Sequence, residues 1–263
     1  MPKREPGKIA RIAAGLRAEI ESGKYPPGAK LPSVSELQAS EGIAFQTARD
    51  VFAVLERETL VVTRQGKGSY VTPFLGKITR DGIGRYQPSA RSEGGAHGAF
   101  QAELSRLGLT YKPSPTEVGR DRPPRAVAVV LGLHHSAKAV FRARTMRAAR
   151  KDAADSFVVQ LATSWFPVDI AGGTRIEEQD TGPGGSKSLL AELGHTQRQI
   201  RESIEVRFPT VEEAAALGIP ADRQVYDLAH HASTSEGRVV EVATHVMPVN
   251  FWRFSYVWEL DAA

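Results

Sequence analysis

Residues 31–71 read LPSVSELQASEGIAFQTARDVFAVLERETLVVTRQGKGSYV, and this stretch decides the fold of the first part of the chain. Ser33, followed three residues later by Glu36, has the spacing of a capping box, which starts a short helix. Gly42 breaks that helix, and apolar residues at helical spacing predict a second helix over about residues 44–58. A short helix, a tight turn and a longer helix are typical of a helix-turn-helix.

A β-hairpin is predicted directly after these helices. Residues 60–63 and 69–72 favour strands, and the segment 64–68, RQGKG, forms a tight basic tip between them. An amphipathic helix over residues 8–22 precedes the quoted stretch. Three helices and a hairpin predict a winged helix-turn-helix over residues 1–73, a fold that lays one helix in a DNA groove.

The rest of the chain has a different character. At 263 residues, the protein suits two domains better than one. Residues 74–97 contain five glycines and no sustained apolar period, so we expect a linker there. Residues 98–263 alternate strand–turn–strand pairs with short helices, which predicts a mainly antiparallel sheet with packed helices. The expected fold class of the whole chain is therefore α+β.

The composition argues against several classes of protein. The chain is 41% hydrophobic and 24% charged, and it has no apolar run of about 18 residues, so we expect no membrane span. The first residues lack the apolar centre of a signal peptide. There are no cysteines for disulfides, thiolate nucleophiles or cysteine metal sites. A cytoplasmic location is the expectation that follows.

The net charge of +4 is unevenly distributed along the chain. Residues 1–96 hold 15 Lys/Arg against 10 Asp/Glu, whereas residues 97–263 hold 19 against 20. The positive excess therefore lies with the predicted helix-turn-helix, where it can neutralise DNA phosphates.

Motifs in both parts of the chain resemble those of the GntR family of bacterial transcription regulators, in particular its HutC-like branch. In the first part they are Pro27-Gly28, Leu31-Pro32-Ser33, Gln46-Thr47, Arg49, Leu55-Glu56 and residues 64–68. In the second they include Leu107-Gly108-Leu109, Arg142-x-Arg144, residues 162–167, residues 182–185, Arg207-x-Pro209-Thr210, residues 237–241 and Trp252-Arg253-Phe254. The second set resembles the UTRA effector-binding domain, which has a chorismate-lyase-like fold.

This resemblance implies a mode of action. It implies a homodimer that binds a two-fold, inverted-repeat DNA operator and changes its DNA affinity when a small molecule binds the UTRA domain. Repression is the usual mode of the family. We therefore expect a ligand-responsive repressor, with no cofactor and no enzymatic activity.

The candidate DNA contacts lie on the two helix starts and the hairpin tip. A glutamine on the first turn of the predicted recognition helix can read an adenine edge, while threonine and arginine can contact phosphates. A helix N-terminus can offer backbone amides to a phosphate, and a glycine tip lets the hairpin approach a minor groove. The predicted set is Ser33, Ser35, Phe45, Gln46, Thr47, Arg49, Arg64, Gly66 and Lys67.

Some of these positions depart from the family pattern. The family usually has arginine where this chain has Ser35 and Phe45, and serine where it has Ala44. Asp50 adds a negative charge beside Arg49. Each lost phosphate contact lowers the salt dependence of binding, and a dimer loses each contact twice. The protein is expected either to read an unusual operator or to bind DNA weakly, with Phe45 packing on a thymine methyl or a sugar.

The candidate effector contacts begin with two arginines on one strand. Arg142 and Arg144 are two residues apart, so they project from the same face and can grip a carboxylate or phosphate. The effector is therefore expected to carry an anionic group. By resemblance to sugar-phosphate-sensing relatives, the arginine pair faces the ligand pocket and Glu241 meets polar groups of the ligand. Thr163 and Ser164 can supply hydroxyls and amides to the same site, and Trp165 a stacking wall. The alternatives are a solvent-facing strand edge for the arginines, a core position for Trp165 and a strand-neighbour pair for Glu241.

Other readings of the sequence have weaker support. The pairs His134-His135 and His230-His231 are sequence neighbours that point apart, so no metal site is expected. Residues 182–188 lack the order of a phosphate loop. An enzyme related to chorismate lyase is the rival from another class, although no activated nucleophile or acid–base pair is evident. A third possibility is a ligand-binding module whose DNA binding is weakened or lost.

Overall fold

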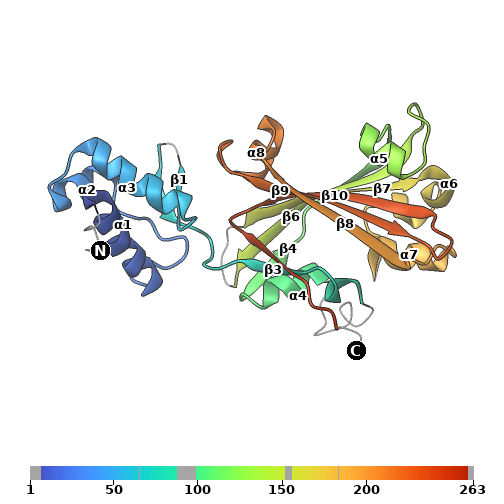
Figure 1. Ribbon diagram of the computed structural model, residues 1–263, viewed down its shortest axis with the longest axis horizontal. Helices are drawn as coiled ribbons and strands as arrows, with labels where there is room; N and C mark the ends of the chain where they lie inside the picture. The colour runs from blue at the N-terminus through green and yellow to red at the C-terminus, as the bar shows by residue number, and fades with distance from the viewer. Residues whose placement is uncertain (1–6, 65, 88–98, 152–155, 183, 260–263) are drawn as a thin grey trace. The chain divides into compact units, whose positions relative to one another are not determined.

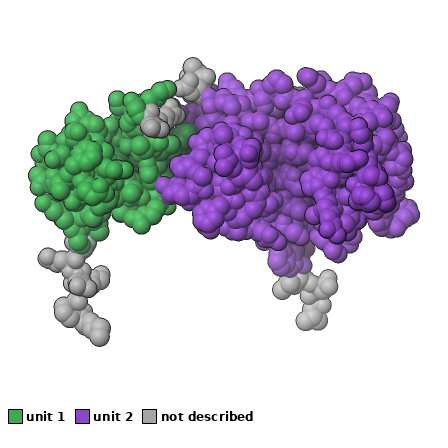
Figure 2. Space-filling view, turned by 90° about the horizontal axis from the view of Figure 1, so that it is seen from above, with its two compact units in different colours: residues 1–76 green, residues 77–263 purple. Residues whose placement is uncertain are grey.

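The computed structural model describes residues 7–64, 66–87, 99–151, 156–182 and 184–259. The chain divides into two compact units, residues 1–76 and residues 77–263, which Figure 2 draws in different colours. Within the described ranges, no helix is both long enough and apolar enough to cross a membrane.

The first unit has three helices followed by a hairpin (Figure 1). In chain order these are α1 (Lys8–Glu21), α2 (Val34–Glu41), α3 (Phe45–Arg57), β1 (Val61–Arg64) and β2 (Gly68–Val71). The two strands are antiparallel. The predicted winged helix-turn-helix is confirmed.

The start of α2 shows how local sequence sets local structure. The Ser33 hydroxyl accepts a hydrogen bond from the backbone N–H of Glu36 at 3.2 Å, and the Glu36 carboxylate accepts one from the backbone N–H of Ser33 at 2.7 Å. This is the predicted capping box. The backbone hydrogen bond from Ser33 holds the pKa of Glu36 below its ordinary value. The helix ends at Gly42, whose φ of 56° is left-handed backbone that glycine adopts without strain.

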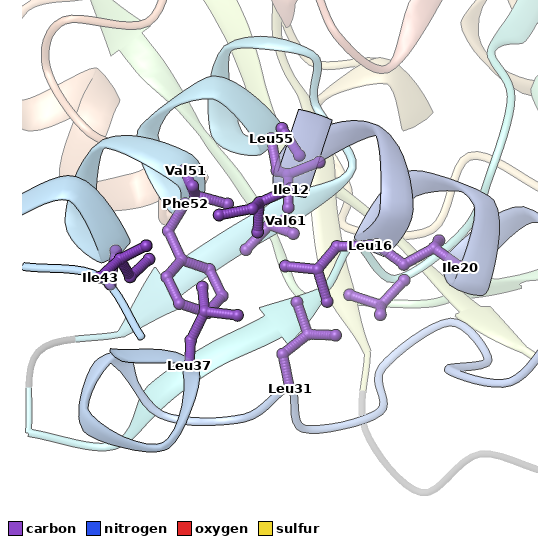
Figure 3. Packing of buried hydrophobic residues seen from close by; sticks show 13 residues of the cluster. Ile12, Leu16, Ile20, Leu31, Leu37, Ile43, Val51, Phe52, Leu55 and Val61 are labelled. Atoms are coloured by element: carbon purple, nitrogen blue, oxygen red, sulfur yellow. The ribbon is translucent and has the colours of Figure 1, made fainter. Parts of the chain in front are cut away.

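Apolar side chains from all three helices meet in one core (Figure 3). Leu16 of α1, Leu37 of α2 and Phe52 of α3 are all at least nine-tenths buried, and Val61 of β1 joins them. Burying each such side chain stabilises the fold by about 1.5–3 kcal/mol. Because the core takes one face of α3, the opposite face of that helix is left for another partner.

The second unit is built on one seven-stranded sheet. Its strands are β4 (Leu109–Lys112), β5 (Thr116–Asp121), β6 (Ala139–Arg150), β7 (Phe157–Pro167), β8 (Gln199–Arg207), β9 (Val225–Ser233) and β10 (Val239–Pro248). The order is β4-β6-β7-β10-β9-β8, with β5 also paired to β6. Every pairing in this sheet is antiparallel, as predicted.

Helices pack on both faces of this sheet. They are α4 (Ala99–Ser105), α5 (Arg125–Val130), α6 (Val168–Ala171), α7 (Gly185–Glu192) and α8 (Val211–Leu217), with the short 3-10 helices η1 (Gly84–Tyr86) and η4 (Arg175–Glu177). On one face, Leu190 of α7 packs with Val140 and Phe166. On the other, Val127 of α5 packs with Trp165. These two layers decide which sheet residues are available to a ligand.

The predicted linker over residues 74–97 needs a correction. Residues 88–97 lie outside the described residues, but residues 77–87 belong to the second unit. They include β3 (Ile78–Asp81), which pairs in parallel with β11 (Trp252–Ser255) at the far end of the chain. Strand β3 is only four residues long and its partner is distant in sequence, so local periodicity could not reveal it.

Candidate DNA-binding and effector-binding sites

The exposed face of α3 carries the residues of this helix that are predicted to contact DNA. Phe45 is 50% exposed, Gln46 and Arg49 are exposed, and Thr47 is half-buried. The helix N-cap, Ala44, makes no side-chain hydrogen bond to the first turn, and no acidic residue lies in that turn. The positive end of the helix dipole is therefore not offset by a local carboxylate in the first turn, which suits contact with an anion such as DNA phosphate.

Gln46 is held by a neighbour one turn along α3. Its Nε2 donates to Oδ1 of Asp50 at 2.9 Å. A carboxylate can only accept, so this contact fixes which end of the Gln46 amide faces Asp50. Asp50 thereby orients Gln46, a role that goes beyond the negative charge noted in the sequence.

The hairpin of β1 and β2 forms the wing. Arg64 pairs with Gly68, and the tip lies between them. Gly66 and Gly68 have φ values of 71° and 100°, a backbone conformation that residues other than glycine rarely adopt. Lys67 is exposed at the tip. Of Arg64 only the backbone pairing is described, so its predicted DNA contact lies outside the described side chains.

Two predicted serines lie at the start of α2. Ser35 is exposed, as a DNA contact requires. The backbone amide of Ser33, in contrast, already donates to Glu36 within the capping box. The expectation that Ser33 offers a backbone amide to a phosphate is therefore corrected: any amide that α2 offers must come from the residues after it.

The second candidate site is a cavity of about 320 Å³ in the second unit, near the low end of the range for small-molecule sites. Its floor is a row of paired residues. Arg142 of β6 pairs with Ser164 of β7, and Ser164 with Ala243 of β10. Ala243 in turn pairs with His230 of β9. Directly paired residues share a face of the sheet, so this row lines the cavity together.

Arg142 and Arg144 both line the cavity, but they are used differently. The guanidinium of Arg142 donates to the backbone carbonyls of Ile176 at 2.7 Å and Gln179 at 2.9 Å, and also to that of Glu178. Arg142 therefore holds the chain around η4 in place, and its contact with the effector stays a prediction.

Arg144 is better placed to meet a ligand. Its Nη2 donates to the Ser164 hydroxyl at 3.0 Å, and its buried Nε has no hydrogen-bond partner among the described residues. Burial lowers the pKa of Arg144, and the nearby charge of Glu241 opposes that shift. An arginine remains protonated in proteins, so Nε is a donor awaiting an acceptor.

Glu241 also lines the cavity and is 5% exposed. Its Oε2 accepts from Nε2 of Gln197 at 2.8 Å. Burial would raise the pKa of Glu241, but the charge of Lys187 and this hydrogen bond favour the carboxylate and help to bring its pKa below the ordinary value. Glu241 is therefore an ionised acceptor in the cavity wall.

Thr163 and Trp165 are corrected, because they lie on the other face of β7. Trp165 pairs with Val242 and packs in the core beneath α5, and Thr163 pairs with Ala143 and Thr244. Successive residues of a strand alternate between faces, so Ser164 enters the cavity while its two neighbours cannot. This rule, applied to the sequence from 163 to 165, could have separated them.

Several cavity residues were absent from the sequence-based set. Arg80 and Tyr86 come from the segment predicted as a linker, Lys187 from the glycine-rich loop, and His230 and His245 from strands. The start of α7 borders the cavity at Gly184, where φ is 79° and a Cβ would lie 2.0 Å from the Ser188 hydroxyl oxygen. Only glycine fits there.

The cavity is positively charged. Among the described residues, five cations line it (Arg80, Arg85, Arg142, Arg144 and Lys187), against one carboxylate, Glu241. Two of the cations are paired with carboxylates beside the cavity, Arg80 with Glu202 and Arg85 with Glu103. Five positive charges against three negative leave an excess of two, which favours an anionic occupant.

Comparison with known proteins places both units in one family. Residues 8–71 match the bacterial regulatory proteins of the gntR family, and residues 106–251 match the UTRA domain. The HTH-type transcriptional regulator SCO4628 of Streptomyces coelicolor is 31% identical over 255 residues, which cover 95% of this chain and 91% of that protein. Rv0792c, an HTH-type transcriptional regulator of Mycobacterium tuberculosis, is 23% identical over 88% of this chain and 78% of its own.

Solved structures agree with this assignment. The crystal structure of a GntR-family transcriptional regulator aligns with a TM-score of 0.55 at 25% identity, covering 98% of this chain and 99% of that one. PhnF from Mycobacterium smegmatis aligns with a TM-score of 0.55 at 18% identity over 94% of this chain and 99% of its own, which shows the shared fold. The chain belongs to the GntR family of bacterial regulatory proteins: it is a transcriptional regulator, not an enzyme, with a DNA-binding helix-turn-helix and a UTRA effector domain.

Proposed function

We propose that this regulator is a homodimeric repressor in the cytoplasm, and that an anionic small molecule in the UTRA cavity releases it from an inverted-repeat operator. The observation that carries the proposal is the cavity itself. Its lining has an excess of positive charge, and it contains buried hydrogen-bond donors that have no partner among the described residues. An acceptor-rich anion satisfies both features, because buried polar groups are costly when unpaired.

The first unit supplies the proposed operator contacts. The exposed start of α3 presents Phe45, Gln46, Thr47 and Arg49. With the α2 start at Ser33 and Ser35 and the wing at Arg64, Gly66 and Lys67, they form the proposed DNA surface. A homodimer would present this surface twice, which fits an operator of two-fold symmetry.

A gel-shift titration tests the DNA half of this proposal. Full-length protein is titrated against DNA upstream of its own gene at several salt concentrations. We expect tight binding. The logarithm of the binding constant should fall linearly with the logarithm of the salt concentration, with a slope of roughly 0.9 for each phosphate contact. Lys67→Ala is expected to reduce that slope by roughly 1.8 in a dimer, one lost contact per protomer. Glu117→Ala, on β5 of the second unit, is the control and should leave the slope unchanged.

The effector half needs a second measurement. A thermal-shift screen of metabolites finds a ligand, and the gel shift is repeated with it. Release of the operator by an anionic hit supports the proposal. If the protein binds an anion but no DNA at any salt concentration, it is instead a ligand-binding module that has lost DNA binding, as the non-basic Ser35 and Phe45 would allow.

A further inference from the structure

We infer that the effector carries an anionic group with its own hydrogen-bond donor beside it, such as a protonated phosphate or an α-hydroxy carboxylate, and that Arg80 and His230 recognise it. This inference rests on the proposed function of the cavity and specifies its chemistry. Neither residue belongs to the sequence-predicted effector set. Both border the cavity, Arg80 from β3 and His230 from the middle of β9.

Arg80 supplies the anion-binding donors. The side chain is 1% exposed. Its Nη2 donates to the Tyr86 hydroxyl at 2.9 Å and to the Glu202 carboxylate. Its Nε and Nη1 are buried and have no hydrogen-bond partner among the described residues. With the Nε of Arg144, three guanidinium nitrogens in the cavity wall have no acceptor in the part of the chain that the structure describes.

His230 supplies an acceptor, and the hydrogen-bond network determines this. The Tyr86 hydroxyl contacts Glu202, and a carboxylate accepts only, so Tyr86 must donate to Glu202. A hydroxyl has one proton, and Nδ1 of His230 lies 2.7 Å from the same oxygen. Nδ1 must therefore carry the proton and donate to Tyr86.

The other nitrogen of His230 is then an acceptor. Burial lowers the pKa of His230 to about 4, so the ring is neutral at physiological pH. In a neutral ring with a proton on Nδ1, Nε2 holds a lone pair. Nε2 is buried and has no partner within the described ranges. A ligand that satisfies the cavity wall therefore supplies a hydrogen-bond donor to His230 and hydrogen-bond acceptors to Arg80 and Arg144.

The position of Arg80 in the chain adds a consequence for regulation. The first unit ends at Gly76, and β3 begins at Ile78. An effector held by Arg80 is therefore bound to the first strand that follows the DNA-binding unit. The bound anion therefore contacts the segment that connects the cavity to the DNA-binding unit along the chain.

Inorganic phosphate and sulfate are the probes that test this chemistry. They have similar size and shape, but at neutral pH phosphate keeps at least one proton and sulfate none. Binding of each ion to the full-length protein is measured by calorimetry at constant ionic strength. We expect phosphate to bind wild-type protein on the order of 10-fold more tightly than sulfate, because only phosphate can donate to Nε2 of His230.

Two variants separate the two roles. His230→Phe keeps a ring of similar size and removes Nε2, so we expect phosphate to fall to the affinity of sulfate. Arg80→Gln removes the guanidinium, so both ions should bind on the order of 10-fold to 100-fold more weakly. If Arg80→Gln does not fold because Glu202 is left unpaired, the double variant Arg80→Gln/Glu202→Gln removes both charges of the pair. Arg207→Gln, which breaks ion pairs with Glu213 and Asp227 outside the cavity, is the matched control and should keep both affinities.

A second pair of probes distinguishes phosphate from carboxylate ligands. Glycolate and acetate differ by one hydroxyl, and the same preference for the hydroxylated acid is expected if the natural anion is a carboxylate. The proposal is overturned if neither hydroxyl-bearing anion binds better than its partner, or if His230→Phe leaves the preference unchanged. Operator binding is measured separately without ligand, so that result would leave the DNA-binding half of the proposed function standing.

Discussion

The exposed face of α3, which is proposed to contact DNA, and the floor of the proposed effector cavity are assembled in different ways. The face of α3 comes from one continuous segment of 13 residues, whose other side is held in the core by Val51, Phe52 and Leu55. The cavity combines residues as far apart in sequence as Arg142 and His245, which the pairing of strands in the seven-stranded sheet brings together, with Arg80 added from the separate β3–β11 pair. The first site therefore depends on the packing of one helix, and the second on the register of a whole sheet.

The largest expected effect is on the core that holds α3. Phe52 is 3% exposed, and Phe52→Ala should lower the free energy of unfolding of the first unit by about 3–5 kcal/mol. Urea unfolding followed by circular dichroism measures it, and gel shift should show loss of DNA binding. Phe45→Ala on the same helix is the control, since a half-exposed phenylalanine should cost less than about 1 kcal/mol. Equal losses would mean that Phe45 is part of the packing.

The next effect is the acid sensitivity of the cavity. The pKa of His230 is about 4 in the folded protein and 6.5 in its ordinary state, so the unfolded chain binds more protons between these values. Stability is therefore lost as pH falls from 6.5 towards 4, by about 2–3 kcal/mol from this residue. His230→Phe should flatten that part of the curve of unfolding free energy against pH. An unchanged curve would show that His230 is not buried as a neutral ring.

A smaller effect tests the structural role of Arg142. Arg142→Ala leaves the buried carbonyl of Ile176 without its donor and should lower the free energy of unfolding by about 1–3 kcal/mol, with operator binding intact. Arg120→Ala is the control, because Arg120 binds the exposed side of the same segment through Glu177 and should cost less than about 1 kcal/mol. An Arg142→Ala protein with unchanged stability but no effector response would restore Arg142 to the ligand site.

The smallest expected effect concerns the cap of α2. Ser33→Ala removes the side-chain cap and should cost about 1 kcal/mol of unfolding free energy. Ser35→Ala, at the exposed second residue of the same helix, should stay within about 0.5 kcal/mol. Chemical unfolding measures the free energy of unfolding of both serine variants, and the difference between them gives the contribution of the cap. A larger loss of unfolding free energy for Ser35→Ala than for Ser33→Ala would contradict the assignment of Ser33 as the N-cap.

Much of the first unit could be predicted from the sequence. The capping box at Ser33, the break at Gly42 and the buried face of α3 are patterns that neighbouring residues create among themselves. The cavity was predicted only in part. Arg144, Ser164 and Glu241 line it as expected, whereas Arg142 lines it but is used mainly to hold backbone carbonyls.

The other differences from the sequence-based set have two causes, strand alternation and contacts between distant segments. Thr163 and Trp165 were grouped with Ser164 although a strand sends neighbours to opposite faces. Arg80 was missed because β3 is recognisable only through its pairing with β11. His230 was missed because its hydrogen-bond partner, Tyr86, comes from a distant segment.

The fold class, the family and the helix-turn-helix can be predicted from the sequence, because helix period and capping depend on residues within about four positions of one another. Which side chains share the cavity depends instead on the tertiary structure. Strand partners can lie anywhere along the chain, so the row from Arg142 to His230 exists only once the sheet has formed.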